Sequence, residues 1–180
     1  AESGHFTMGK PYQLPYFESF KDMQEMKGPW LGMLLDNQKG AWFVDEEGYR
    51  PSCEPFDGNG GLVTFSPSEA GHTSSIATPL VCIDDAEYPT LGFYFYCTRE
   101  NDSRLSVGVR TAQTELEDIR SFKISDTSFS LGWNLVRIPI VDYKGEEYVQ
   151  VYFTGLAGEE YTNHIHLDCI GISDIPRYDV

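Results

Sequence analysis

A glycine-rich loop, EPFDGNGGLVTF at residues 54–65, carries two oxygen-bearing side chains close together. Asp57 and Asn59 stand two residues apart in a stretch whose backbone carbonyls can converge, and calcium requires oxygen sets of this kind. The same residues also predict an ordinary turn, because glycine tolerates positive φ and Asp and Asn bond to their own backbone. A phosphate cradle is excluded, since the loop leads into an apolar alternating run and not into a helix. The segment by itself leaves a turn and a calcium loop open.

Near the C-terminus, His164, His166 and Asp168 have the types and the alternating spacing of metal ligands. On a strand these three side chains point to one face, while Ile165 and Leu167 point to the other. Zinc uses such ligands, but three positions along one strand span roughly 13 Å, so only a neighbouring pair could share an ion. We therefore expect an outward-facing polar side of a strand.

Two tyrosines, Tyr94 and Tyr96, alternate with Phe93 and Phe95. One pair must therefore leave the core that the other pair fills. Exposed tyrosines could stack on a sugar ring or on a partner protein, and a sheet covered on both faces explains them equally well. The candidate ligand-stacking residues are Tyr94, Tyr96, Trp42 and Tyr152.

The elements that position these residues are short strands. Apolar and polar residues alternate at period two through most of the chain, and turn-rich spacers such as DDAEYP and DYKGEE separate the runs. Many short antiparallel strands imply two packed sheets, so we expect an all-β sandwich. Two runs each offer one apolar face that must meet another sheet. The residues expected to be buried together are Leu105, Val107, Val109, Val149, Val151 and Phe153.

Three local predictions follow from the same patterns. The apolar phase slips within WNLVRIPI, residues 133–140, which predicts a β-bulge and places Pro139 at an edge. Cys169 shares the apolar side of the last strand with Leu167, so we expect it in the core and inaccessible to thiol reagents. Helical periodicity is confined to FKDMQEMKG, residues 20–28.

Composition excludes several classes of function. The chain has 180 residues, the usual size of one domain, and 28 acidic against 13 basic residues give a net charge of −15. This charge repels nucleic acid and anionic membrane surfaces, and the sequence lacks the ~18-residue apolar run of a membrane helix. The four cysteines lack C-x-x-C spacing, and neither a G-x-S-x-G elbow nor the paired-carboxylate strand of laminarinase-like glycosidases occurs. We expect no nucleic acid partner, no membrane insertion and no enzymatic activity.

The order of segments resembles a known family. Phe17-Glu18, DGNGGLVTF, ATPLVCI, LGFYFY, LSVGVRT, a tryptophan in GWNLVRIPI, YVQVYFTGLAG and IHLDCIGI follow one another as in the MAM domain and the related cleaved-adhesin domains of bacterial surface proteins. The resemblance covers about residues 15–173. Pro15 and Thr90 stand where the family has cysteines, so the family disulfides cannot form, which favours a bacterial relative.

The resemblance implies a jelly-roll β-sandwich that recognises a ligand and does not catalyse a reaction. In such domains a structural calcium ion sits where the Phe-Glu strand, the Asp-Gly loop and the Asp of the last strand meet. Matched by position, this implies calcium held by Glu18, Asp57 and Asp168, with Asn59 as a fourth contributor. The segment GKPYQLPYFESF also resembles the junction that follows a fibronectin type III-like domain.

The sequence therefore predicts a MAM-like domain over residues 15–175, with connectors at 1–14 and 176–180. We expect a non-catalytic adhesion or recognition module of a larger bacterial cell-surface or secreted protein, stabilised by calcium and binding an extracellular protein or glycan. The alternative is a carbohydrate-binding module attached to a glycan-processing protein, in which the four aromatic residues above would form the stacking surface. A glycosidase of the same broad fold is a third interpretation, and the missing carboxylate pair argues against it.

Overall fold

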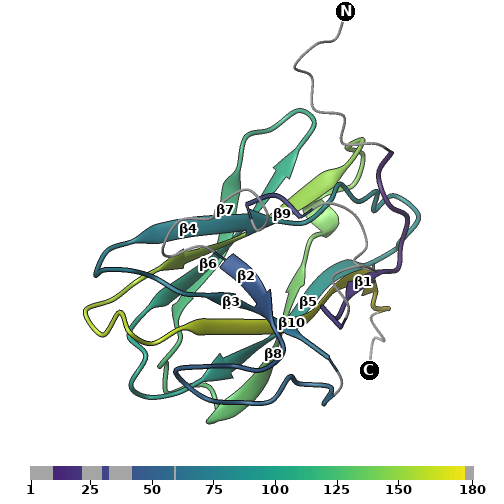
Figure 1. Cartoon of the computed structure of the whole chain (residues 1–180). Helices are drawn as coiled ribbons and strands as arrows, with labels where there is room; N and C mark the ends of the chain where they lie inside the picture. Colours follow the sequence, from purple (N-terminus) through teal and green to yellow (C-terminus); the bar gives the residue numbers. More distant parts are fainter. Residues whose placement is uncertain (1–9, 22–29, 33–41, 59, 177–180) are drawn as a thin grey trace, which may run out of the picture.

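Two antiparallel sheets pack face to face in this chain (Figure 1). The computed structural model describes residues 10–21, 30–32, 42–58 and 60–176. The larger sheet runs in the order β2 (Trp42–Asp45), β3 (Leu62–Phe65), β10 (Ile165–Asp174), β5 (Pro89–Cys97) and β8 (Gly132–Pro139), with β1 (Tyr16–Glu18) also paired to β10. The smaller sheet runs in the order β4 (Thr73–Ala77), β9 (Val149–Leu156), β6 (Arg104–Thr111) and β7 (Glu117–Lys123). A short 3-10 helix, Val141–Tyr143, follows β8. The predicted all-β sandwich is confirmed.

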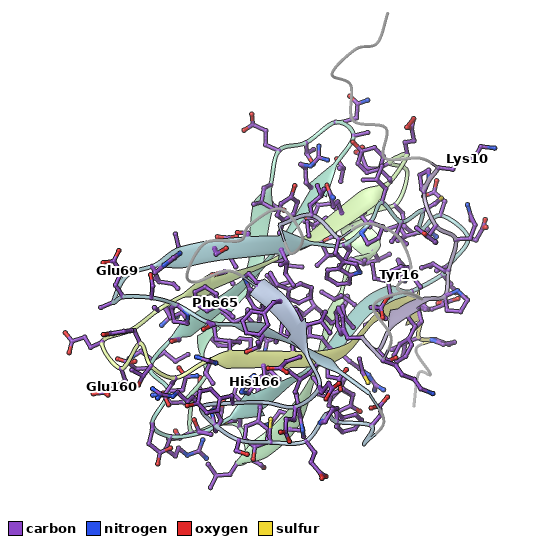
Figure 2. The ribbon with its side chains drawn as sticks, in the orientation of Figure 1. Lys10, Tyr16, Phe65, Glu69, Glu160 and His166 are labelled. Carbon is purple, nitrogen blue, oxygen red and sulfur yellow. The ribbon has the colours of Figure 1, made fainter. Side chains whose placement is uncertain are left out.

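The core lies between the two sheets and is built from the alternating apolar residues. Phe93 of β5 and Phe153 of β9 meet edge to face across the interface, with ring centroids 5.1 Å apart. Phe65 of β3 lies between the sheets (Figure 2) and packs against Gly155 of β9, where a Cβ atom would collide with the ring. The six residues predicted to be buried together are all fully buried, which confirms that prediction: Leu105, Val107, Val109, Val149, Val151 and Phe153.

The last strand contains an irregularity that the sequence pattern did not indicate. The pairing of β10 with β5 shifts between Asp168 and Gly171, and Cys169 has a φ of 49°. The alternation therefore restarts, and Ile170 enters the core cluster whereas Cys169 does not. Cys169 is buried, as predicted, but its predicted place in the core beside Leu167 is wrong. Burial raises the pKa of its thiol to about 12, so the thiol is protonated at neutral pH.

Strand β8 lacks the bulge predicted for residues 133–140. It pairs with β5 in one continuous register from Gly132 to Pro139. Its buried residues are Val136 and Ile138, and Trp133 and Leu135 point to the outer face of the sheet. The apparent phase slip is therefore a change from outward to inward apolar residues along one regular strand. Pro139 ends an edge strand, as expected.

The N-terminal segment joins the sandwich before β1 begins. The backbone of Tyr12 bonds to Leu80 and Cys82, at 2.8 Å each, and Leu14 packs against the core. Part of the segment predicted as a connector therefore packs against the domain. The predicted helical segment falls mainly on residues 22–29, outside the described residues. In the described part of the chain, no helix is long and apolar enough to cross a membrane.

Candidate functional site

A loop between β2 and β3 covers part of the outer face of the larger sheet. Gly48 and Cys53 close this loop by exchanging backbone hydrogen bonds of 2.7 and 3.3 Å. Further along the loop, the ring of Phe56 stacks on Tyr94 of β5, with centroids 3.6 Å apart and planes 19° apart. The outer face is thus partly roofed by residues 46–58 and partly open.

Four aromatic residues gather where the roof ends, and we call Phe56, Tyr94, Tyr96 and Trp133 the aromatic cluster. Trp133 meets Tyr96 edge to face at 5.3 Å and Phe56 at 6.3 Å. The indole Nε1 of Trp133 donates a hydrogen bond of 3.0 Å to the carbonyl of Glu54, which ties β8 to the loop. Phe56 is 41% exposed although it packs on Tyr94, so the cluster presents an aromatic surface to solvent.

The four residues predicted to stack on a ligand are not brought together. Tyr94 and Tyr96 point outward from β5, as the alternation predicted, whereas Tyr152 points outward from β9 of the other sheet. Trp42 is fully buried, and its Nε1 donates to the carbonyl of Ser74 at 2.9 Å. Its assignment to a ligand surface is therefore wrong, because it packs in the core with its one polar atom already bonded.

Asp168 lies under the roof, on the outer side of β10. Its Oδ1 accepts a hydrogen bond of 2.7 Å from the backbone N–H of Cys169, and its Oδ2 accepts one of 2.9 Å from Phe56. The carboxyl is fully buried, and burial raises its pKa to about 7, with the negative charge of Asp57 adding to the effect. Asp168 thus anchors the loop that carries Phe56 and stands near Asp57.

Glu18 occupies the opposite side of the larger sheet. Tyr16 and Glu18 are buried while Phe17 between them is exposed, so Glu18 points inward and its Oε2 accepts a 2.7 Å hydrogen bond from Phe20 N–H. Among the described residues, no three His, Cys, Asp or Glu side chains form a group able to hold a metal ion. The structure therefore brings Asp57 near Asp168 but does not assemble the cage that would add Glu18.

The remaining predicted ligand, Asn59, lies outside the described residues. The predicted calcium set includes this residue, so calcium binding stays a prediction.

His164 and His166 also leave the core, as the spacing predicted, but the loop covers them. Nε2–H of His166 donates to the carbonyl of Pro51 at 3.0 Å, and burial lowers the pKa of this imidazole to about 4. Among the described residues, the buried Nδ1 atoms of both rings meet no hydrogen-bond partner within bonding geometry. The expected outward polar face is therefore present, but it lies beneath the loop and not in solvent (Figure 2 labels His166).

Beside the aromatic cluster the outer face is hollowed. A groove of about 210 Å³ is lined by residues of β1, β5, β8 and β10, including Phe17, Tyr94, Leu135 and Arg137. Cys169 also lines this groove. Phe56, Trp133 and Arg137 were not among the predicted site residues, although an unbroken strand with Trp133 and Leu135 outward would have predicted the exposed face of β8.

These features define the chain as a jelly-roll β-sandwich with an aromatic surface on one sheet. Residues 23–176 match the MAM domain, meprin/A5/mu, family. The chain therefore belongs to the MAM domain family, as the order of its segments predicted. No curated protein matches the sequence significantly.

Solved structures share this fold at low sequence identity. The K1 cleaved adhesin domain of Lys-gingipain from Porphyromonas gingivalis W83 is 14% identical, with a TM-score of 0.57, over 90% of this chain and 99% of that one. The CBM27-1 module of Caldicellulosiruptor saccharolyticus, solved with mannohexaose, is 16% identical, with a TM-score of 0.57, over 89% and 98%. TmCBM61, solved with β-1,4-galactotriose, is 12% identical, with a TM-score of 0.52, over 82% and 89%. At these identities the likeness concerns the fold.

Proposed function

We propose that this chain is a non-catalytic recognition module of a larger secreted or cell-surface protein, and that it binds its ligand on the outer face of the larger sheet. The observation that carries the proposal is the aromatic cluster of Phe56, Tyr94, Tyr96 and Trp133, which is held in place by Asp168 and Glu54 and yet reaches solvent. Rigid, partly exposed aromatic rings give binding energy at low entropic cost.

Two classes of extracellular ligand, protein and glycan, fit such a module. The arrangement of the rings favours a glycan, because Phe56 is 41% exposed while it stacks on Tyr94, and Trp133 stands edge to face beside it. Flat apolar faces of sugar rings pack against such surfaces, with hydroxyl groups turned toward polar neighbours. The net charge of −15 keeps the module away from nucleic acid and anionic lipid. Flanking domains such as a fibronectin type III-like domain belong to the same proposal.

The first test screens the whole chain on an array of extracellular glycans and matrix proteins. We expect binding to a glycan, and we expect Phe56→Ala to weaken it about tenfold or more, because removing a central aromatic contact typically costs over 1 kcal/mol. Tyr152→Ala is the matched control, since Tyr152 lies on the other sheet. If Tyr152→Ala weakens binding and Phe56→Ala does not, the proposed face is wrong.

Calcium stabilisation is a further part of the proposal. It is supported by the family resemblance and by the closeness of Asp57 to the buried Asp168, since a cation relieves the repulsion between neighbouring carboxylates. We expect EDTA to lower the melting temperature and excess calcium to restore it, because a ligand at a hundredfold excess over Kd stabilises the native state by about 2.7 kcal/mol.

Asp57→Ala is expected to blunt the calcium response, and Asp142→Ala, on the 3-10 helix, is its matched control. Magnesium in place of calcium tests the choice of ion. Melting curves that coincide in EDTA and in calcium would contradict this part of the proposal and leave the recognition face unaffected.

A further inference from the structure

The groove beside the aromatic cluster has a defined cross-section, because four residues on four neighbouring strands stand in one row. Phe17 of β1 pairs with Gly171 of β10, Gly171 pairs with Gly92 of β5, and Gly92 pairs with Arg137 of β8. Directly paired residues present their side chains to the same face of a sheet. The row is therefore an aromatic wall whose ring lies over Gly171, a floor at Gly92 and a cationic wall.

Gly92 does not need to be glycine for the fold. Gly92 is not one of the glycines with a positive φ. A Cβ atom there would meet its nearest neighbours at 3.9 Å, which is an ordinary contact. Glycine inside a strand weakens the strand, and it often marks a bulge, a bend or a place where a ligand or another backbone approaches. Gly171 differs, because its Cβ would come within 3.0 Å of the Tyr16 carbonyl, so internal packing accounts for it.

The walls of the groove differ in chemistry. Phe17 is 47% exposed on one side, and Leu135, 40% exposed, continues the apolar surface on the other. Arg137 is exposed beside Leu135, and its guanidinium is one of only 13 basic groups in a strongly acidic chain. A guanidinium presents parallel N–H donors that match a carboxylate, whereas an aromatic ring matches the C–H face of a sugar. An apolar wall facing an arginine across an open floor suits a ring that carries a carboxylate.

We propose that the groove between Phe17 and Arg137 binds an acidic sugar residue, a hexuronate or a related sugar acid, within the glycan that the aromatic cluster engages. The sugar ring lies over Gly92 against Phe17, and its carboxylate pairs with Arg137. Tyr94 lines the groove and also stacks with Phe56, so the groove and the aromatic cluster form one continuous surface. This inference rests on the proposed function and adds the class of sugar that the face prefers.

The test titrates the whole chain with three probes: a galacturonate trisaccharide, a glucuronate trisaccharide and the neutral galactose trisaccharide. We expect one of the two acidic probes to bind at least tenfold more tightly than the neutral one, and this preference to shrink as salt is raised from 20 to about 500 mM, because salt screens a partly exposed pair. Calorimetry or chemical-shift titration gives the affinities.

Two substitutions separate the walls from the floor. Arg137→Gln is expected to weaken the acidic probe about tenfold while leaving neutral glycans unaffected, because it removes a charge-assisted hydrogen bond at an exposed position. Gly92→Val is expected to abolish binding in the groove by filling its floor, with a melting temperature at least equal to that of the unmodified chain, since valine favours strands. Arg104→Gln and Ser106→Val, on the outer side of β6 in the other sheet, are the matched controls.

The outcomes distinguish this inference from the function on which it rests. A preference for the acidic probe that Arg137→Gln and Gly92→Val both remove supports the groove. Glycan or protein binding that is lost in Phe56→Ala but unchanged in Gly92→Val and Arg137→Gln overturns the groove and keeps the proposed function. Absence of binding to every glycan, with a protein ligand captured on the array instead, overturns the inference as well.

Discussion

Replacing Trp42 by alanine is expected to lower the free energy of unfolding by about 3–5 kcal/mol, the range for deleting a large buried aromatic side chain. Trp42 is fully buried, its ring packs against Phe65 with centroids 5.4 Å apart, and its Nε1 bonds to the carbonyl of Ser74. The substitution removes apolar contacts and leaves that carbonyl without its donor, and both effects act in the same direction. Chemical denaturation followed by far-ultraviolet circular dichroism measures the loss.

The neighbouring residue supplies the control. Phe43 follows Trp42 on β2, but it points outward and is 40% exposed, so Phe43→Ala is expected to cost less than about 1 kcal/mol. Together the two variants test whether Trp42 holds the core or contacts a ligand. A Trp42→Ala protein with unchanged stability and lost ligand binding would support the ligand-stacking role that the sequence predicted, against the burial seen in the structure.

The second prediction concerns two buried groups under the loop, whose effects on stability oppose each other as the pH falls. The pKa of His166 is lowered by burial to about 4 from its ordinary 6.5. The unfolded chain therefore takes up a proton first, and stability is lost between about pH 6.5 and 4. The pKa of Asp168 is raised by burial to about 7 from 3.8. The folded chain therefore takes up this proton first, and stability is gained as pH falls from about 7 to 4.

Single substitutions should expose each half of this balance. In Asp168→Asn only the histidine remains, so we expect acidification from pH 7 to 4 to lower stability by on the order of 3 kcal/mol relative to the variant that carries both Asp168→Asn and His166→Gln. In His166→Gln only the carboxyl remains, and acidification should raise stability by a similar amount. Denaturant unfolding of the two single variants, the double variant and the unmodified chain in EDTA measures the four slopes.

The four-protein comparison removes the contribution of the other titratable groups, because they are common to all four chains. The groups that face the pair are His164, Asp45 and Cys53 near His166, and Asp57, Cys53 and Cys169 near Asp168. None of them is altered in the variants. Identical slopes for Asp168→Asn and the unmodified chain would show that this carboxyl titrates normally, and the buried-loop arrangement would then be wrong.

The predicted interactions share one physical basis, which is the roof formed by residues 46–58. The roof shields Asp168 and His166 from solvent. Asp168 in turn accepts a hydrogen bond from the backbone of Phe56 and so holds its ring against Tyr94. A substitution under the roof should therefore reach the recognition face as well. Asp168→Asn keeps one oxygen acceptor for the two N–H donors of Cys169 and Phe56. The backbone of Phe56 would then lose its hydrogen bond, and Phe56 is the first aromatic residue expected to shift.

Several features were determined by the sequence alone. Alternation at period two is a local property, so it identified the strands and the inward residues Val107, Val109, Val149 and Val151 without any knowledge of their partners. It also placed Tyr94 and Tyr96 outside the core. The order of motifs along the chain predicted the family, because that order survives where single residues diverge.

Other features were decided only by the tertiary structure. Alternation gives two faces to a strand but does not say which is covered by a loop, so Trp42 could not be placed in the core nor Asp168 beneath Phe56. The shift at Cys169 depends on how β10 passes from its pairing with β3 to its pairing with β1. The groove depends on the registers of three strand pairs, which bring Phe17, Gly171, Gly92 and Arg137 into one row. Register is fixed by contacts between residues far apart in the chain, so spacing within any one segment carries no record of it.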